Sequence, residues 1–166
     1  MKRLFAMILL PVFLMGCSAA PVFESVEDVY APMLPDPGEL QVVVPDDATV
    51  LTSGGEGGDT LYFCSGYTMT VQILEGGDLN RSVETLTGYS RDSLTVMQTV
   101  RDGVACYSCA WTSAGEGGDQ VGRLVLLDDG AYHYAVSVMA PAAEAGALTE
   151  TWDDILNRVT LRSTDS

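Results

Sequence analysis

The segment that decides the fold is Val121-Gly-Arg-Leu-Val-Leu-Leu-Asp-Asp-Gly-Ala-Tyr-His-Tyr-Ala-Val-Ser-Val-Met139. Two apolar-rich runs, 121–127 and 131–139, flank Asp128-Asp129-Gly130. An Asp-Gly pair between two such runs is typical of a tight β-hairpin turn, because both residues tolerate positive φ angles. Alternation along the second run places four side chains on one face, which we expect to be the core face: Tyr132, Tyr134, Val136 and Val138.

The same hairpin pattern continues towards the N-terminus. Runs 94–100 and 104–112 flank Arg101-Asp102-Gly103, so we expect these two strands and the two described above to form a four-strand antiparallel meander. Upstream, Tyr67-Thr-Met-Thr-Val-Gln-Ile-Leu74 alternates between apolar and polar residues, which predicts a half-buried strand. Shorter strands are expected at 40–44, 49–52 and 59–64.

Two segments have helical patterns. Asp78 and Gly88 suit the N-cap and the C′ position of a helix over 79–87. A longer helix is predicted from Pro141 to Arg158, with one apolar stripe formed by Leu148, Trp152, Ile155, Leu156 and Val159. The prediction is therefore an α+β domain: an antiparallel β-sheet meander with a short middle helix and a long C-terminal helix packed on one face.

The order of these elements resembles the PsbP/Mog1-like α+β fold. The resemblance rests on strand order and on the ending Tyr132-x-Tyr134 followed by Trp152-x-x-Ile155-Leu156. It implies a terminal helix lying across an antiparallel sheet and a mostly non-catalytic role in assembly and docking. Because the likeness is at the level of the fold, it implies little about function.

The N-terminus carries an export signal. Lys2 and Arg3 precede an apolar run that is short for a membrane span, and Leu14-Met15-Gly16-Cys17 follows it. This tetrad resembles the lipobox of bacterial lipoproteins, which implies cleavage before Cys17 and diacylglyceryl transfer to its thiol. The resemblance implies a protein anchored to the cell membrane by lipid and facing outside the cytoplasm. An ordinary cleaved signal with a chance cysteine and an uncleaved N-terminal helix are the alternatives.

These patterns divide the chain into four predicted parts. They are a signal peptide at 1–16, a lipidated cysteine with a proline-rich tether at 17–38, a single domain at 39–162 and a frayed tail at 163–166. The predicted mature chain has six arginines, no lysine and 23 acidic residues, a formal charge of −17. Such a surface repels nucleic acid, so we expect no nucleic-acid partner. We also expect a monomer that is attached to the membrane through lipid on Cys17. The acidity serves solubility or, alternatively, a cationic partner or divalent ions.

Three cysteines remain after Cys17, and outside the cytoplasm a disulfide is permitted. We expect either a bridge between Cys64 and one of Cys106 and Cys109, or three buried thiols. Cys106-Tyr-Ser-Cys109 has the spacing of a redox motif, but in a strand its two cysteines point to opposite faces.

A glycine-rich segment occurs twice, as Ser53-Gly-Gly-Glu-Gly-Gly-Asp59 and Ser113-Ala-Gly-Glu-Gly-Gly-Asp119. The first copy resembles the nonapeptide of calcium-binding RTX repeats. In those repeats, backbone carbonyls and an aspartate carboxylate bind the calcium ion. Two hairpin loops without a ligand are the simpler interpretation. If both loops lie at the same end of the sheet, one weak calcium site is expected from Glu56, Asp59, Glu116 and Asp119.

No catalytic set emerges from the sequence. His133 is the one histidine, and alternation places it opposite Tyr132 and Tyr134, where we expect it to face solvent. The function predicted is a non-catalytic binding, docking or assembly module for an unknown protein or small ligand, without a cofactor. The alternatives are a weak calcium binder and an extracytoplasmic enzyme, which would need a pocket around His133 or acidic residues with perturbed pKa values.

Overall fold

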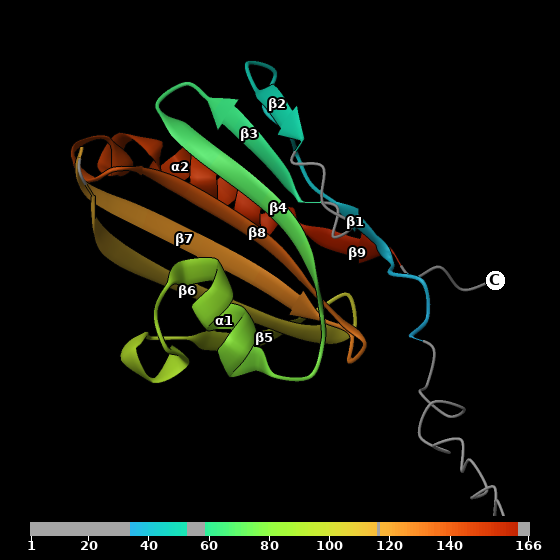
Figure 1. Cartoon of the computed structure of the whole chain (residues 1–166). Coiled ribbons are helices and arrows are strands. Elements are labelled where there is room, and N and C mark those ends of the chain that lie inside the picture. The colour runs from blue at the N-terminus through green and yellow to red at the C-terminus, as the bar shows by residue number, and fades with distance from the viewer. Residues whose placement is uncertain (1–33, 53–58, 116, 163–166) are drawn as a thin grey trace, which may run out of the picture. The chain divides into compact units, whose positions relative to one another are not determined.

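The computed structural model describes residues 34–52, 59–115 and 117–162. The chain divides into two units, 1–33 and 34–166, and all described residues belong to the second. Figure 1 shows strands with one helix on either side of them. The elements are β1 (Glu39–Gln41), β2 (Thr49–Thr52), β3 (Thr60–Cys64), β4 (Tyr67–Glu75), α1 (Leu79–Thr87), a 3₁₀ turn (Arg91–Ser93), β5 (Met97–Arg101), β6 (Val104–Gly115), β7 (Gly118–Asp128), β8 (Tyr132–Pro141), α2 (Ala142–Asn157) and β9 (Thr160–Arg162).

The main sheet has seven strands in the order β2-β3-β4-β8-β7-β6-β5, and every pairing is antiparallel. The α+β class is confirmed. The strands β5 to β8 lie side by side in chain order, and β4 joins them through β8. No described helix is long and apolar enough to cross a membrane.

Two strand predictions need correction. The strand expected at 40–44 is the shorter β1, which pairs with β9 in a separate two-stranded sheet. The strand expected from Leu94 begins only at Met97, because the 3₁₀ turn at Arg91–Ser93 occupies the chain just before it. In both cases the partner strand was not visible in the sequence, and Met97 and Val100 of β5 are exposed although they are apolar.

Local sequence explains the turns and the short helix. Asp102 and Gly103 both have positive φ, 52° and 83°, as a two-residue hairpin turn with the twist of its strands requires. The Asp78 carboxylate accepts hydrogen bonds from the backbone N–H groups of Asn80 and Arg81, and Gly88 ends α1 in the left-handed conformation.

The sheet is covered on both faces. The core on the α2 face includes Met69, Tyr134, Val136, Trp152 and Ile155, with the rings of Tyr67 and Trp152 packed edge to face at 6.2 Å. The core on the α1 face is smaller and includes Cys109, Trp111, Leu124, Leu126 and Ala135. The strands β7 and β8 therefore lie between two hydrophobic layers.

A hydrogen-bonded clasp holds the start of the domain against the β7–β8 hairpin. The Tyr134 hydroxyl donates to Asp129 Oδ2 and accepts from the Gly38 N–H, both at 2.7 Å. The Tyr132 hydroxyl donates to the Pro35 carbonyl at 2.8 Å. Burial and the neighbouring Asp129 carboxylate raise the pKa of Tyr134 to about 12, so its hydroxyl stays a donor at all ordinary pH values.

Candidate docking groove

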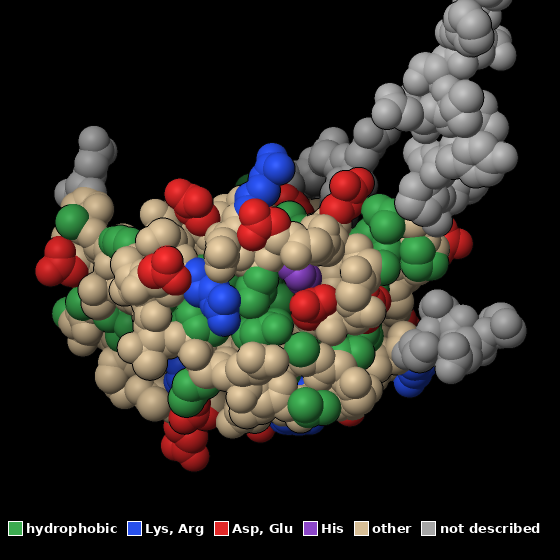
Figure 2. All heavy atoms as spheres, turned by 90° about the horizontal axis from the view of Figure 1, so that it is seen from below, with side chains coloured by type: hydrophobic (Ala, Val, Ile, Leu, Met, Phe, Trp, Pro, Cys, Tyr) green, Lys and Arg blue, Asp and Glu red, His purple; other side chains and the backbone are tan. Residues whose placement is uncertain are grey.

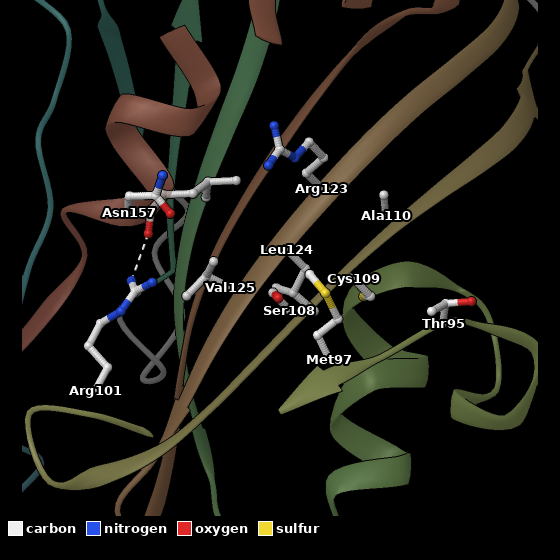
Figure 3. Close-up of a pocket in the computed structure, with 11 residues that line it drawn as sticks. Thr95, Met97, Arg101, Ser108, Cys109, Ala110, Arg123, Leu124, Val125 and Asn157 are labelled. Atoms are coloured by element: carbon white, nitrogen blue, oxygen red, sulfur yellow. Dashed lines mark hydrogen bonds between the residues drawn. The ribbon is translucent and has the colours of Figure 1, made fainter. Parts of the chain in front are cut away.

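A groove of about 390 Å³ lies on the α2 face of the sheet, between the C-terminal end of α2 and the edge strand β5. Its floor comes from three neighbouring strands, with Met97 on β5, Ser108 on β6 and Val125 on β7. Leu156 and Asn157 at the end of α2 form one wall (Figure 3). The groove exists because α2 packs on β7 and β8, which leaves the two strands beyond them uncovered on this face.

Arg101 is fixed at one end of the groove. Its Nη1 donates to the carbonyl oxygen of Leu156 in the last turn of α2 at 2.7 Å (Figure 3). The same Nη1 donates to the carbonyl oxygen of Val159, just beyond α2, at 3.1 Å. A cation is favourable there because the helix dipole and the unpaired carbonyls both place negative charge at a helix C-terminus. Arg101 therefore connects the edge strand to α2 and holds a positive charge beside the groove.

The groove differs in charge from the rest of the domain. Arg101 and Arg123 both line it, and none of its lining residues is acidic. Arg123 pairs with Asp153 at 2.6 Å, whereas no described carboxylate lies within ion-pair distance of Arg101. Acidic side chains are spread around the face shown in Figure 2. Arg101 is thus held by backbone carbonyls at the end of α2 and forms no ion pair with a described carboxylate.

The strand bordering the groove is open. β5 is the last strand of the sheet, so its outer edge has no neighbour among the described residues. Met97 is 64% exposed and Val100 is 76% exposed, although both are apolar. The strand has no proline or lysine, and its pairing with β6 is continuous without a bulge. Proline, lysine and bulges are three of the devices that protect edge strands from pairing, and Arg101 is the one charged residue of β5.

The prediction that His133 faces solvent is wrong. Its side chain points away from Tyr134, as alternation requires, but it is only 1% exposed because α1 covers that face. His133 Nδ1 lies 2.7 Å from Ser82 Oγ, and Nε2 lies 3.7 Å from Asp128 Oδ2. Three residue types of a hydrolytic triad are thus brought together, yet Asp128 is beyond hydrogen-bond length and the imidazole is enclosed. We interpret Ser82 and His133 as a buried polar contact between α1 and β8, with Asp128 of β7 partly exposed beside it.

The structure has free thiols, the second of the two alternatives for the cysteines. Cys64, Cys106 and Cys109 are free thiols in the structure. Three strands separate β3 from β6, about 19 Å across the sheet, whereas a disulfide tolerates a Cα separation of roughly 7 Å. Cys106 and Cys109 face the α2 core and the α1 core respectively. Burial raises the pKa of the Cys109 thiol, which disfavours the thiolate that redox chemistry needs.

The register of the sheet separates the two glycine-rich loops. Thr60 is level with Val125 through the pairs Thr60–Val71, Val71–Val136 and Val136–Val125. Asp119 lies six residues before Val125 on β7, and Asp59 lies one residue from Thr60 in the opposite direction, which places the two residues about 23 Å apart along the strand direction. Asp59 also accepts a hydrogen bond from Gln72 Nε2 at 3.1 Å. Asp59 and Asp119, the two described members of the proposed calcium set, therefore do not lie close together.

Several predicted residues lie outside the described part of the chain. They are Cys17 with its lipobox, and Glu56 and Glu116 of the proposed calcium set. Within residues 34–52, 59–115 and 117–162, no group of three or more His, Cys, Asp or Glu side chains is placed to hold a metal ion. The groove beside α2 was not anticipated from the sequence. Its one signal in the sequence was the apolar Met97 on an expected strand that is followed directly by Arg101.

Comparison with known proteins gives the class of fold. No protein-family model matches the chain, and no curated protein matches it. Solved structures similar to it include the cyanobacterial PsbP of Synechocystis sp. PCC 6803, with 11% identity, a TM-score of 0.58 and coverage of 74% of this chain and 86% of that chain. LpqN of Mycobacterium tuberculosis, described as involved in cell envelope biogenesis, gives 15% identity, a TM-score of 0.52 and coverage of 77% and 87%. A variant of the protein Mog1 gives 17% identity, a TM-score of 0.51 and coverage of 75% of this chain and 92% of that chain. These likenesses support the PsbP/Mog1-like fold and, at such identities, the fold alone.

Proposed function

We propose that the chain is a bacterial lipoprotein, held at the membrane by lipid on Cys17, whose domain docks a protein partner outside the cytoplasm. The domain carries out no reaction of its own in this proposal and needs no cofactor. Its partner is a protein and not a nucleic acid, because the formal charge of −17 after the signal repels phosphate.

The order of features at the N-terminus supports the anchor. Positive charge, a short apolar run, a small residue and Cys17 follow one another as in lipoprotein signals. The absence of lysine after the signal also fits attachment through acyl chains rather than through a basic surface.

The observation that carries the docking role is the groove beside α2 with its unprotected edge strand. A domain without a partner at this place would expose Met97 and Val100 to water for no structural gain. The likeness to PsbP and LpqN is one of fold and is compatible with such a role.

Metabolic labelling with an alkyne fatty acid in a bacterial host tests the anchor. We expect the mature chain to carry the label and to partition into detergent, and Cys17→Ser to lose both properties. Mass spectrometry that finds an intact leader, or an unmodified Cys17 thiol, would contradict the anchored lipoprotein.

Site-specific photo-crosslinking in the native host tests the docking role. A photoreactive amino acid replaces Met97 in the groove and, as a matched control, the exposed Thr151 on α2. We expect one reproducible crosslinked protein from position 97 and none from position 151. Equal crosslinking from both positions, or none from either, would contradict docking at this groove.

A further inference from the structure

We propose that the open edge of β5 accepts an extended segment of the protein partner as an eighth strand of the main sheet, and that a carboxylate of this segment pairs with Arg101. The inference rests on the proposed docking function and adds the mode of binding and the chemistry of the partner.

The hairpin geometry determines which backbone groups of β5 face outward. Asp102 and Gly103 form a two-residue turn, so Arg101 and Val104 are the pair that closes the hairpin. Hydrogen-bonded pairs recur at every second residue, which directs Thr99 and Met97 towards β6 as well. The N–H and C=O groups of Gln98 and Val100 therefore point to the free edge, where an added strand would pair with them.

The side chains define what the added strand must carry. Met97, Thr99 and Arg101 share the α2 face of β5 by alternation, next to the groove. A residue directly opposite one of them in an added strand has its Cβ about 5 Å away, within reach of the guanidinium. Arg101 has spare N–H donors beyond the Nη1 that binds α2, and no described carboxylate takes them. A glutamate or aspartate on this face is the complementary side chain, with apolar residues beside it to cover Met97.

The net charge of the domain sets a second condition. A strongly acidic domain repels an acidic protein, but this repulsion is screened over about 8 Å at physiological ionic strength, while Arg101 acts at contact distance. The segment should therefore carry one carboxylate within a neutral or basic surrounding. The same repulsion disfavours pairing of β5 with a second copy of this chain.

The other edge of the sheet supports the choice of β5. The edge strand β2 also exposes apolar residues, with Val50 53% and Leu51 55% exposed. Its sequence Thr49-Val-Leu-Thr52 contains no charged residue. Only the β5 edge combines unpaired backbone groups with a fixed cation.

Two matched peptides test the proposal by NMR titration of the mature chain carrying Cys17→Ser. The probes are Ser-Thr-Val-Glu-Val-Thr-Ser and the same peptide with lysine in place of glutamate. We expect the glutamate peptide to shift the amide signals of Gln98 and Val100 and to bind at least tenfold more tightly than the lysine peptide, roughly the discrimination of one charge-assisted hydrogen bond. Arg101→Gln should remove the difference between the two peptides.

The backbone contribution has its own pair of variants. Val100→Pro removes an outward N–H that the β5–β6 ladder does not use, and should weaken the glutamate peptide at least tenfold, an effect on the order of one lost hydrogen bond. Val100→Thr keeps the N–H and should bind like the parent. If Val100→Pro does not fold, an N-methylated glutamate peptide, which cannot pair along the edge, should lose binding to the parent chain.

Three outcomes would overturn the proposal. The first is equal affinity of the parent chain for the glutamate and lysine peptides. The second is unchanged affinity of the folded Val100→Pro variant for the glutamate peptide. The third is a dimer in sedimentation, with a second copy of the chain on the β5 edge. None of these bears on lipid at Cys17 or on crosslinking from position 97, so failure here is distinguishable from failure of the proposed function.

Discussion

The two faces of the main sheet are covered in different ways. On the α2 face, a 16-residue helix packs Trp152, Ile155 and Leu156 against a continuous apolar layer. On the α1 face, a nine-residue helix covers a smaller core and places Ser82 over the buried His133. Stability should therefore depend on apolar packing on the first face, and on shape and polar complementarity on the second.

Loss of Trp152 is the largest effect expected. The side chain is 1% exposed and packs against Tyr67 at the centre of the α2 face, so Trp152→Ala should lower the free energy of unfolding by about 3–5 kcal/mol. Urea denaturation measures the change. Thr151→Ala, at the neighbouring exposed position, should change it by less than about 0.5 kcal/mol. Similar losses for the two variants would show that α2 does not carry the core.

A single methyl group at Gly122 tests the α1 face. A Cβ at this position would overlap the Trp111 ring atoms Cζ2 and Cε2, so Gly122→Ala should destabilise by about 1–3 kcal/mol and alter the near-ultraviolet signal of tryptophan. Gly146→Ala, in α2 with open space around it, should stabilise by about 0.5–1 kcal/mol. Equal signs for the two variants would contradict the tight packing of Trp111 on β7.

The Ser82–His133 contact should have an effect similar in size to that of the Trp111 packing. Ser82→Ala leaves His133 Nδ1 without its partner in a buried site, which should cost about 2 kcal/mol in the free energy of unfolding. Thr85→Ala, on the exposed side of the same helix, serves as the control and should have little effect. An unchanged stability of Ser82→Ala would mean that water reaches the imidazole.

The Tyr134 hydroxyl should have the smallest effect at neutral pH. Tyr134→Phe removes the hydrogen bonds to Gly38 and Asp129 but keeps the buried ring, so we expect a loss of about 1 kcal/mol in thermal or urea unfolding at pH 7.

The pH dependence of the same variant isolates the clasp. The pKa of Tyr134 is raised from 10.0 to about 12 in the fold, so its stabilisation is complete below pH 10 and is lost as the pH rises towards 12. Unfolding midpoints should therefore fall more steeply for the parent than for Tyr134→Phe between these pH values. Tyr67, whose pKa is also raised, is present in both proteins and cancels in the comparison. Parallel curves would show that Tyr134 is not a buried donor.

Sequence patterns predicted local structure better than they predicted neighbours. The hairpin at Asp102-Gly103, the capping of α1 by Asp78 and the apolar stripe of α2 all depend on residues close together in the chain. The error on His133 arose because alternation gives the face of a strand but not whether a helix covers that face. The run Leu124-Val-Leu-Leu127, apolar at every position, was the available sign that both faces are buried.

The disulfide and the shared calcium site are both hypotheses that depend on long-range register. Nothing in the local sequence shows that Cys64 and Cys106 lie on strands four positions apart in the sheet. Nor does it show that Asp59 and Asp119 lie far apart along the strand direction. The docking groove was invisible for the same reason, since its residues come from three strands and the end of a helix.

By itself, the amino-acid sequence determined most strands, turns and helices, the predicted lipidation site at Cys17 and the acidic character of the chain. These features depend on short-range geometry, signal order and composition, which are written in neighbouring residues. Only the tertiary structure decided that β4 pairs with β8, that β5 is left open and that Arg101 reaches the end of α2. The physical reason is that strand pairing and burial depend on which distant surfaces meet, and many pairings satisfy the same local pattern.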